Sequence, residues 1–172
     1  MSYDQPNSLF RFQIPSLSIG ANARSIGIYL SGVLFALGFW FFLDAAIYSK
    51  VANAGTVHIS FVDWIPAICS SLGMLIVNSI DKSKLTSDNY GESSIAWKAK
   101  LILFIGFALL AGGLAGGVVV LVLKYIVPGY PFPTLYFGVA NVLCNGLIML
   151  SSVVLWISVN SSEDEYSYQL QI

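Results

Sequence analysis

Charged side chains are scarce in this chain of 172 residues: they make up 10% of it, whereas 56% of the residues are hydrophobic. The mean hydropathy of +0.76 lies above the usual range of soluble proteins. The eight basic residues are balanced by nine acidic ones and form no cluster that could neutralise a row of phosphates. The composition therefore predicts a membrane protein and argues against a nucleic-acid partner.

Histidine and cysteine are also rare, with one histidine and two cysteines. Cys69 and Cys144 both fall in apolar stretches, where thiols usually behave as small hydrophobic side chains. His58 lies near Asp63, but a metal site generally needs three or four ligands, and no serine nucleophile motif is close by. We therefore expect no catalytic residues, no metal site and no cofactor, and the protein is predicted not to be an enzyme.

What the chain does contain is four long apolar stretches. Each can cross a hydrocarbon core of about 30 Å as a helix that rises about 1.5 Å per residue. The stretches lack the polar alternation of barrel strands, and helices satisfy their own backbone amides in lipid. The predicted fold is therefore all-α, a polytopic membrane protein with four transmembrane helices at about 26–48, 59–80, 101–123 and 135–159, within a transmembrane domain of residues 25–160.

Basic residues predict the orientation, because lysine and arginine accumulate in cytosolic loops. One side of the membrane would carry only Lys50 and Lys124. Both termini are therefore predicted to be cytosolic, and the sequon at Asn160 should stay unglycosylated. The opposite, cytosolic side would carry Arg11, Arg24, Lys82, Lys84, Lys98 and Lys100.

The segments outside the spans are short. Residues 1–24 either lie along the cytosolic headgroups or form a solvated tail, and residues 161–172 form an acidic cytosolic tail. Residues 127–133 contain three prolines, which remove backbone donors and disfavour helical geometry before them. This segment is predicted to be a short, stiff reversal between the third and fourth spans.

The third span contains two overlapping small-residue repeats. Gly112 and Gly116 form one, and Gly113 and Gly117 form the other. Such spacing lets another helix backbone approach closely, which drives association in lipid. The glycines either seat another helix of the same chain or present a surface to a second protein.

Asp44 is an acid inside the first span, about three residues from its lumenal end. A carboxylate at this depth usually finds a partner or a water-filled cavity. A paired structural acid, proton or cation handling, and partner binding are the three interpretations. Lys124, at the end of the third span, shares its leaflet.

Three asparagines also lie in predicted spans. Asn141 and Asn145 lie one turn apart on one face of the fourth span, at the depth of the glycine repeats. They either fasten the bundle through interhelical hydrogen bonds or bind a helix of another subunit. Asn78, near the end of the second span, is expected to be a helix-end amide bonded to the following loop.

Several of these residues carry a resemblance to a known family. They are FWFFLDAA at 39–46, LIVNSI at 75–80, LFIGF at 103–107, Asn141, and the acidic pair at 163–164. In this order they resemble the four-span family of the fungal vacuolar protein sorting-associated protein 68 and related small animal transmembrane proteins, uncharacterised protein family 0220. The resemblance runs from about residue 22 to residue 165.

The resemblance implies membrane traffic rather than chemistry. It implies a subunit of an endosomal sorting complex that acts in late endosome to vacuole transport. Its partner would be a second small four-span protein similar to vacuolar protein sorting-associated protein 55, and its location the endosome and vacuole membranes, or the Golgi and endoplasmic reticulum. The alternative function is a small oligomeric channel or transporter that uses Asp44, Asn141 and Asn145.

Overall fold

The computed structural model describes residues 21–51, 57–80 and 93–169, and all of the regular structure in these ranges is helical. The polar stretch at 81–100 was expected to form the loop between the second and third spans, but its residues 93–100 are helical. Residues 81–92 lie outside the described residues, as do residues 1–20 of the N-terminal segment. The elements are α1 (Ala21–Val51), η1 (Phe61–Trp64), α2 (Ile65–Asn78), α4 (Ser93–Val120), the π-helix η2 (Leu121–Ile126) and α5 (Thr134–Gln169).

Four of these helical stretches are long and apolar enough to cross a membrane, which confirms the predicted all-α, four-span fold. In the most apolar window of each, between 17% and 33% of the residues are buried, so most of the surface is left for lipid or for another protein. The four candidate spans are Arg24–Val51, Phe61–Asn78, Trp97–Ile126 and Thr134–Val159.

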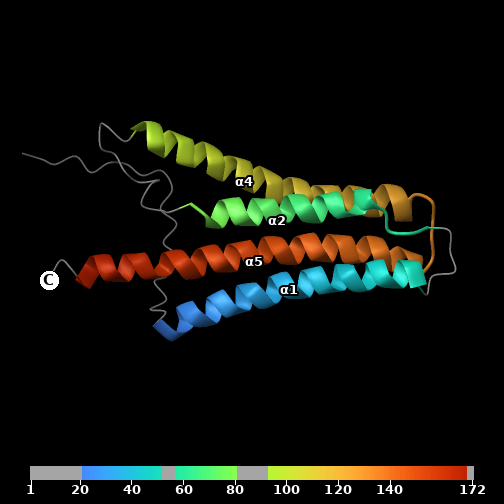
Figure 1. Ribbon diagram of the computed structural model, residues 1–172, viewed down its shortest axis with the longest axis horizontal. Helices are drawn as coiled ribbons and strands as arrows, with labels where there is room; N and C mark the ends of the chain where they lie inside the picture. The colour runs from blue at the N-terminus through green and yellow to red at the C-terminus, as the bar shows by residue number, and fades with distance from the viewer. Residues whose placement is uncertain (1–20, 52–56, 81–92, 170–172) are drawn as a thin grey trace, which may run out of the picture.

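The helices lie side by side as two packed pairs (Figure 1). α1 packs along α5, and α2 packs along α4; α2 and α4 also contact α5 and thereby join the pairs. We call the end at which α1 and η2 end and α5 begins the turn end of the bundle. The opposite end, at which α1 and α4 begin and α2 and α5 end, is called the terminal end. The first and last described residues therefore lie on the same side of the bundle.

Three helices are longer than the spans predicted for them, since α4 already begins at Ser93. The other two are α1 and α5. α1 begins at Ala21 and continues to Val51, and α5 continues to Gln169, ten residues beyond Val159. Neither extension contains a proline, and α5 has no helix-breaking residue after Val159. Loss of hydrophobicity therefore ends the membrane span without ending the helix.

Glycines seat the helices within each pair. A Cβ built on Gly73 of α2 would lie 2.8 Å from both the backbone oxygen of Gly106 and the backbone nitrogen of Leu110 on α4. A Cβ on Gly38 of α1 would lie 3.1 Å from the backbone oxygen of Cys144 on α5. Real Cβ atoms almost never come within 3.0 Å of such groups, so a side chain at Gly73 would separate α2 from α4.

The connection from η2 to α5 is the predicted short reversal. Residues 127–133 are not helical, and Gly129 has a φ of +73°, a left-handed conformation that glycine adopts without strain. The backbone N–H of Gly129 donates to the oxygen of Ile126 (2.9 Å), and that of Tyr130 donates to the oxygen of Tyr125 (3.2 Å). These bonds close the end of η2 before α5 begins.

Candidate functional site

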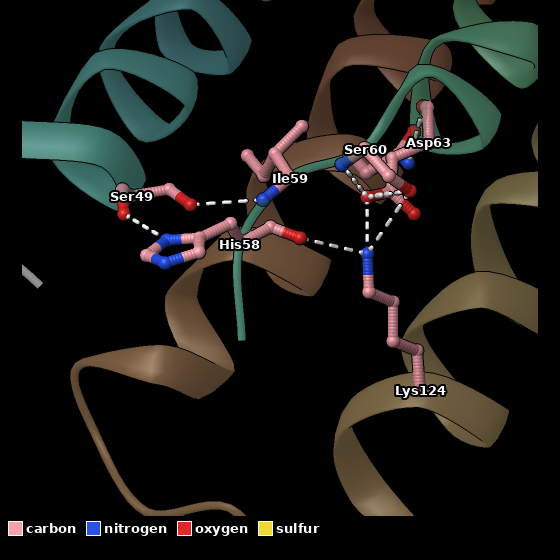
Figure 2. A network of polar contacts seen from close by, with 7 residues as sticks. Ser49, His58, Ile59, Ser60, Asp63 and Lys124 are labelled. Carbon is pink, nitrogen blue, oxygen red and sulfur yellow. Dashed lines mark hydrogen bonds and ion pairs between the residues drawn. The ribbon is translucent and has the colours of Figure 1, made fainter. Parts of the chain in front are cut away.

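The densest polar cluster of the described residues lies at the turn end and is centred on Asp63 (Figure 2). Asp63 is 3% exposed, and its carboxylate forms an ion pair with the ammonium group of Lys124. The same carboxylate accepts hydrogen bonds from the backbone N–H of Ser60 (2.7 Å) and from its hydroxyl (3.3 Å). Ser60 and Asp63 form a capping box at the start of η1, so local sequence orients the acid before Lys124 reaches it.

Lys124 comes from the π-helix η2 and ties the chain before η1 to the third span. Its ammonium group also donates to the backbone oxygen of His58 (3.0 Å), as Figure 2 shows. Ser49 fastens the same segment to α1: its hydroxyl accepts from the backbone N–H of Ile59 (2.8 Å), and its backbone oxygen lies 2.6 Å from Nδ1 of His58. The cluster therefore joins α1, η1 and η2 at one end of the bundle.

A chain of buried amides leads from this cluster toward the centre. Asn141 of α5 donates to the backbone oxygen of Asp63 (2.9 Å). The side chain of Asn145 donates to the side-chain oxygen of Asn141 (2.9 Å) and accepts a bond from the hydroxyl of Ser70 on α2 (2.6 Å). Asn141 is 1% exposed and Asn145 is 0% exposed, so their amides fasten α5 to α2 inside the bundle.

Polar contacts between helices continue toward the terminal end. The amide of Asn78 donates to the backbone oxygen of Met74 (2.9 Å) and to the hydroxyl of Ser152 on α5 (3.1 Å). Ser151 donates to the backbone oxygen of Ser31 on α1 (2.7 Å). Asn78 was expected to bond the following loop; its described partners are instead on α2 and α5, because its helix turns that face toward α5.

Asp44 lies apart from these buried contacts. It is exposed on α1, and its carboxylate accepts a bond of 3.2 Å from the phenol of Tyr136 on α5. Lys124, a cation of the same end, is paired with Asp63 instead. Asp44 therefore does not share a surface with buried Asn141 and Asn145, which the alternative channel hypothesis would place along one pore.

The four glycines of the small-residue repeats point in different directions. A Cβ on Gly113 would lie 2.7 Å from the backbone oxygen of Pro66 on α2, and a Cβ on Gly116 would lie 3.4 Å from the side chain of the same proline. A Cβ on Gly117 would lie 3.0 Å from the amide nitrogen of Asn145. A Cβ on Gly112 would meet nothing within 4 Å. Three of the four glycines thus seat helices of the same chain, and Gly112 faces outward.

Comparison with known proteins assigns the chain to a family. The sequence profile described as Uncharacterised protein family (UPF0220) matches residues 5–166. The chain belongs to the UPF0220 family. This confirms the resemblance drawn from the sequence. No solved structure matches the chain.

The relatives of this UPF0220 protein include fungal and amoebal proteins. The chain is 53% identical over 188 aligned residues, covering 100% of both chains, to "Vacuolar protein sorting-associated protein 68" of Saccharomyces cerevisiae. It is 51% identical over 168 residues to a UPF0220 protein of Schizosaccharomyces pombe, covering 96% of this chain and 97% of the relative. It is 29% identical over 142 residues to "Transmembrane protein 50 homolog" of Dictyostelium discoideum, covering 80% and 91%.

The role of Asp63 in this UPF0220 chain was not predicted from the sequence. The pattern Ser60-Phe61-Val62-Asp63 before an apolar run is a capping-box signature and could have marked this acid as ordered. No local signal pairs it with Lys124, which is 61 residues away. Ser49, Ser70 and Tyr136 were also missed, because single serines and tyrosines in apolar spans carry no distinctive spacing.

The described polar side chains of this UPF0220 protein mainly hold its helices together. Among the described residues, no group of three or more histidine, cysteine, aspartate or glutamate side chains could hold a metal ion. Asp63 and the three span asparagines bond to other parts of the same chain. These contacts fix the helices relative to one another. Among the described residues, most of the surface left for contacts outside the bundle lies on the helix flanks.

Proposed function

We propose that this protein is a membrane subunit of an endosomal sorting complex, acting in late endosome to vacuole protein transport through helix contacts with a second small four-span membrane protein. The partner would be similar to vacuolar protein sorting-associated protein 55. The protein would lie in the membranes of late endosomes and the vacuole, with both termini in the cytosol. The observation that carries this proposal is the 53% identity, over the whole of both chains, to a protein named for vacuolar protein sorting.

The architecture supports an action through helix flanks. Within the described spans, the polar side chains with the lowest exposure, such as Asn141, Asn145, Ser70 and Ser151, bond to other helices of the bundle. What the bundle presents outward is apolar side chains, and this leaves helix packing as the main means of recognition in lipid. A sorting subunit that recognises membrane neighbours needs only such surfaces.

Complementation tests the proposal. The chain would be expressed in Saccharomyces cerevisiae cells that lack their own vacuolar protein sorting-associated protein 68. Delivery of an endocytosed membrane protein to the vacuole lumen would be compared with delivery in cells that carry an empty vector. We expect delivery to return to near the wild-type rate. If the chain reaches endosomes at the native level and delivery stays at the level of the empty vector, the proposed function is wrong.

A further inference from the structure

α1 buries one face and leaves the opposite face uncovered. The buried face packs along α5, with Phe42, Ala45 and Ser49 fully buried. The opposite face carries side chains spaced alternately by four and three residues, the spacing that keeps one side of a helix against a neighbouring helix in a left-handed pair. We call this set the α1 stripe; it consists of Val33, Leu37, Trp40, Asp44, Ile47 and Val51.

The apolar members of the α1 stripe are between 45% and 80% exposed. In a membrane this exposure alone does not indicate a partner, since acyl chains cover apolar side chains without cost. The outward face of α4 shows this: Phe104 is 72% exposed and Val119 is 52% exposed, and no charged residue occurs between Leu101 and Val120. Lipid is a sufficient neighbour for that face.

Asp44 distinguishes the α1 stripe from the outward face of α4. It lies seven residues before the last residue of α1, or about 10 Å along the helix. Its side chain has a single methylene and cannot extend to the headgroups as lysine does. Its carboxylate accepts a hydrogen bond of 3.2 Å from the phenol of Tyr136, a neutral donor. A carboxylate held at this depth by one neutral bond is costly in lipid, and a cation beside it would remove much of that cost.

The described cations of the turn end are placed elsewhere. Lys124 is occupied by Asp63. Lys50 lies six residues after Asp44 and turns toward η1, where it lines an open cavity of about 400 Å³ together with Trp64. Among the residues that the structure describes, no cation is paired with Asp44, so we look for its complement outside the bundle.

We propose that the α1 stripe docks a transmembrane helix of a different protein, and that this helix carries a lysine or arginine at the depth of Asp44. This inference rests on the proposed function, because it requires a membrane partner. A second copy of the chain does not fit the stripe. Two copies in one membrane share the same orientation, so a symmetric contact between their α1 helices would bring Asp44 against Asp44, and like charges in lipid repel.

Crosslinking in native membranes tests the inference with the full-length protein. A photoreactive amino acid would replace Trp40 of the α1 stripe, in the half of α1 nearer the turn end. A matched control would carry it at Val119, on the outward face of α4 and also nearer the turn end. We expect a crosslink from position 40 to a second membrane protein and none to that protein from position 119. The inference would be overturned by a partner that crosslinks only from position 119, or by a crosslinked dimer of this chain. It would also be overturned if position 40 gave only lipid adducts while a partner protein still co-purified.

Two substitutions extend the test. Asp44→Asn keeps an acceptor for Tyr136 but removes the charge, and should weaken association with the partner at least ~10-fold, as for other buried charge pairs that lose one member. Leu37→Trp adds bulk on an outward position, where the monomer has room, and should weaken association similarly. Unchanged association in both variants would overturn the inference. In that case the wild-type protein would still bind a partner, and only the docking surface would be wrong. The proposed function fails in a different way, when the wild-type protein binds no partner at all.

Discussion

The ion pair between Asp63 and Lys124 gives the most quantitative prediction. Lys124→Met would leave a carboxylate that is 3% exposed with only the capping bonds from Ser60. Removing one partner of a buried pair costs about 3–5 kcal/mol. We expect about 3 kcal/mol, at the low end, because the Lys124 side chain is 28% exposed and the Ser60 N–H remains bonded to the acid. Asp63→Asn should cost less, about 1 kcal/mol, since the amide can still accept from Ser60 and the lysine can turn toward water.

The two variants and the double variant Asp63→Asn/Lys124→Met form a double-mutant cycle. Unfolding free energies would be measured in lipid nanodiscs or bicelles with a reversible assay. The coupling energy should exceed about 1 kcal/mol, because removing both charges leaves no unpaired ion. Lys50→Met is the control; this exposed lysine of the same end forms no ion pair with the described residues, and the change should stay within about 0.5 kcal/mol. Additivity within about 0.4 kcal/mol would refute the account of the cluster.

Three further outcomes are expected. Gly113→Leu should lower the unfolding free energy by at least about 2 kcal/mol, because its side chain would meet the α2 backbone. The control Gly112→Leu should change it by less than about 0.5 kcal/mol. Equal effects of the two substitutions in the same assay would contradict the packing. Asn145→Ala should cost about 1–2 kcal/mol, since its removal leaves two buried polar groups without a partner, and a loss below about 0.3 kcal/mol would argue against the amide chain. In sealed vesicles with the cytosolic face outward, Phe132→Cys at the exposed reversal should react with an impermeant thiol reagent only after permeabilisation, and Asn160 should carry no sugar; immediate labelling would reverse the proposed orientation.

The number and kind of the spans could be predicted from the sequence because hydropathy and length nearly determine them in lipid. The reversal at 127–133 was also predictable, because proline prevents helical geometry through local effects on the backbone. Helix ends were less certain. The sequence marks where α5 stops being apolar, near Val159, whereas the helix continues to Gln169 because nothing there breaks it.

Side-chain partners could not be predicted, because they depend on the rotation of each helix about its axis. The π-helix η2 turns Lys124 toward Asp63, and no pattern in the sequence distinguishes that acid from Asp44 as its partner. The same rotation directs Gly113 and Gly117 to different helices and leaves Gly112 outside. Small-residue spacing predicts that helices approach closely, but it does not say which helix approaches.

The most direct test of the whole account is the composition of the assembly in native membranes. The tagged protein would be extracted directly into polymer-bounded nanodiscs without detergent, and the proteins in each disc would be identified and counted by native mass spectrometry. The account predicts one dominant species, in which this chain is accompanied by a second small four-span protein in a fixed ratio. Discs that hold this chain alone, from membranes in which vacuolar delivery is active, would contradict it.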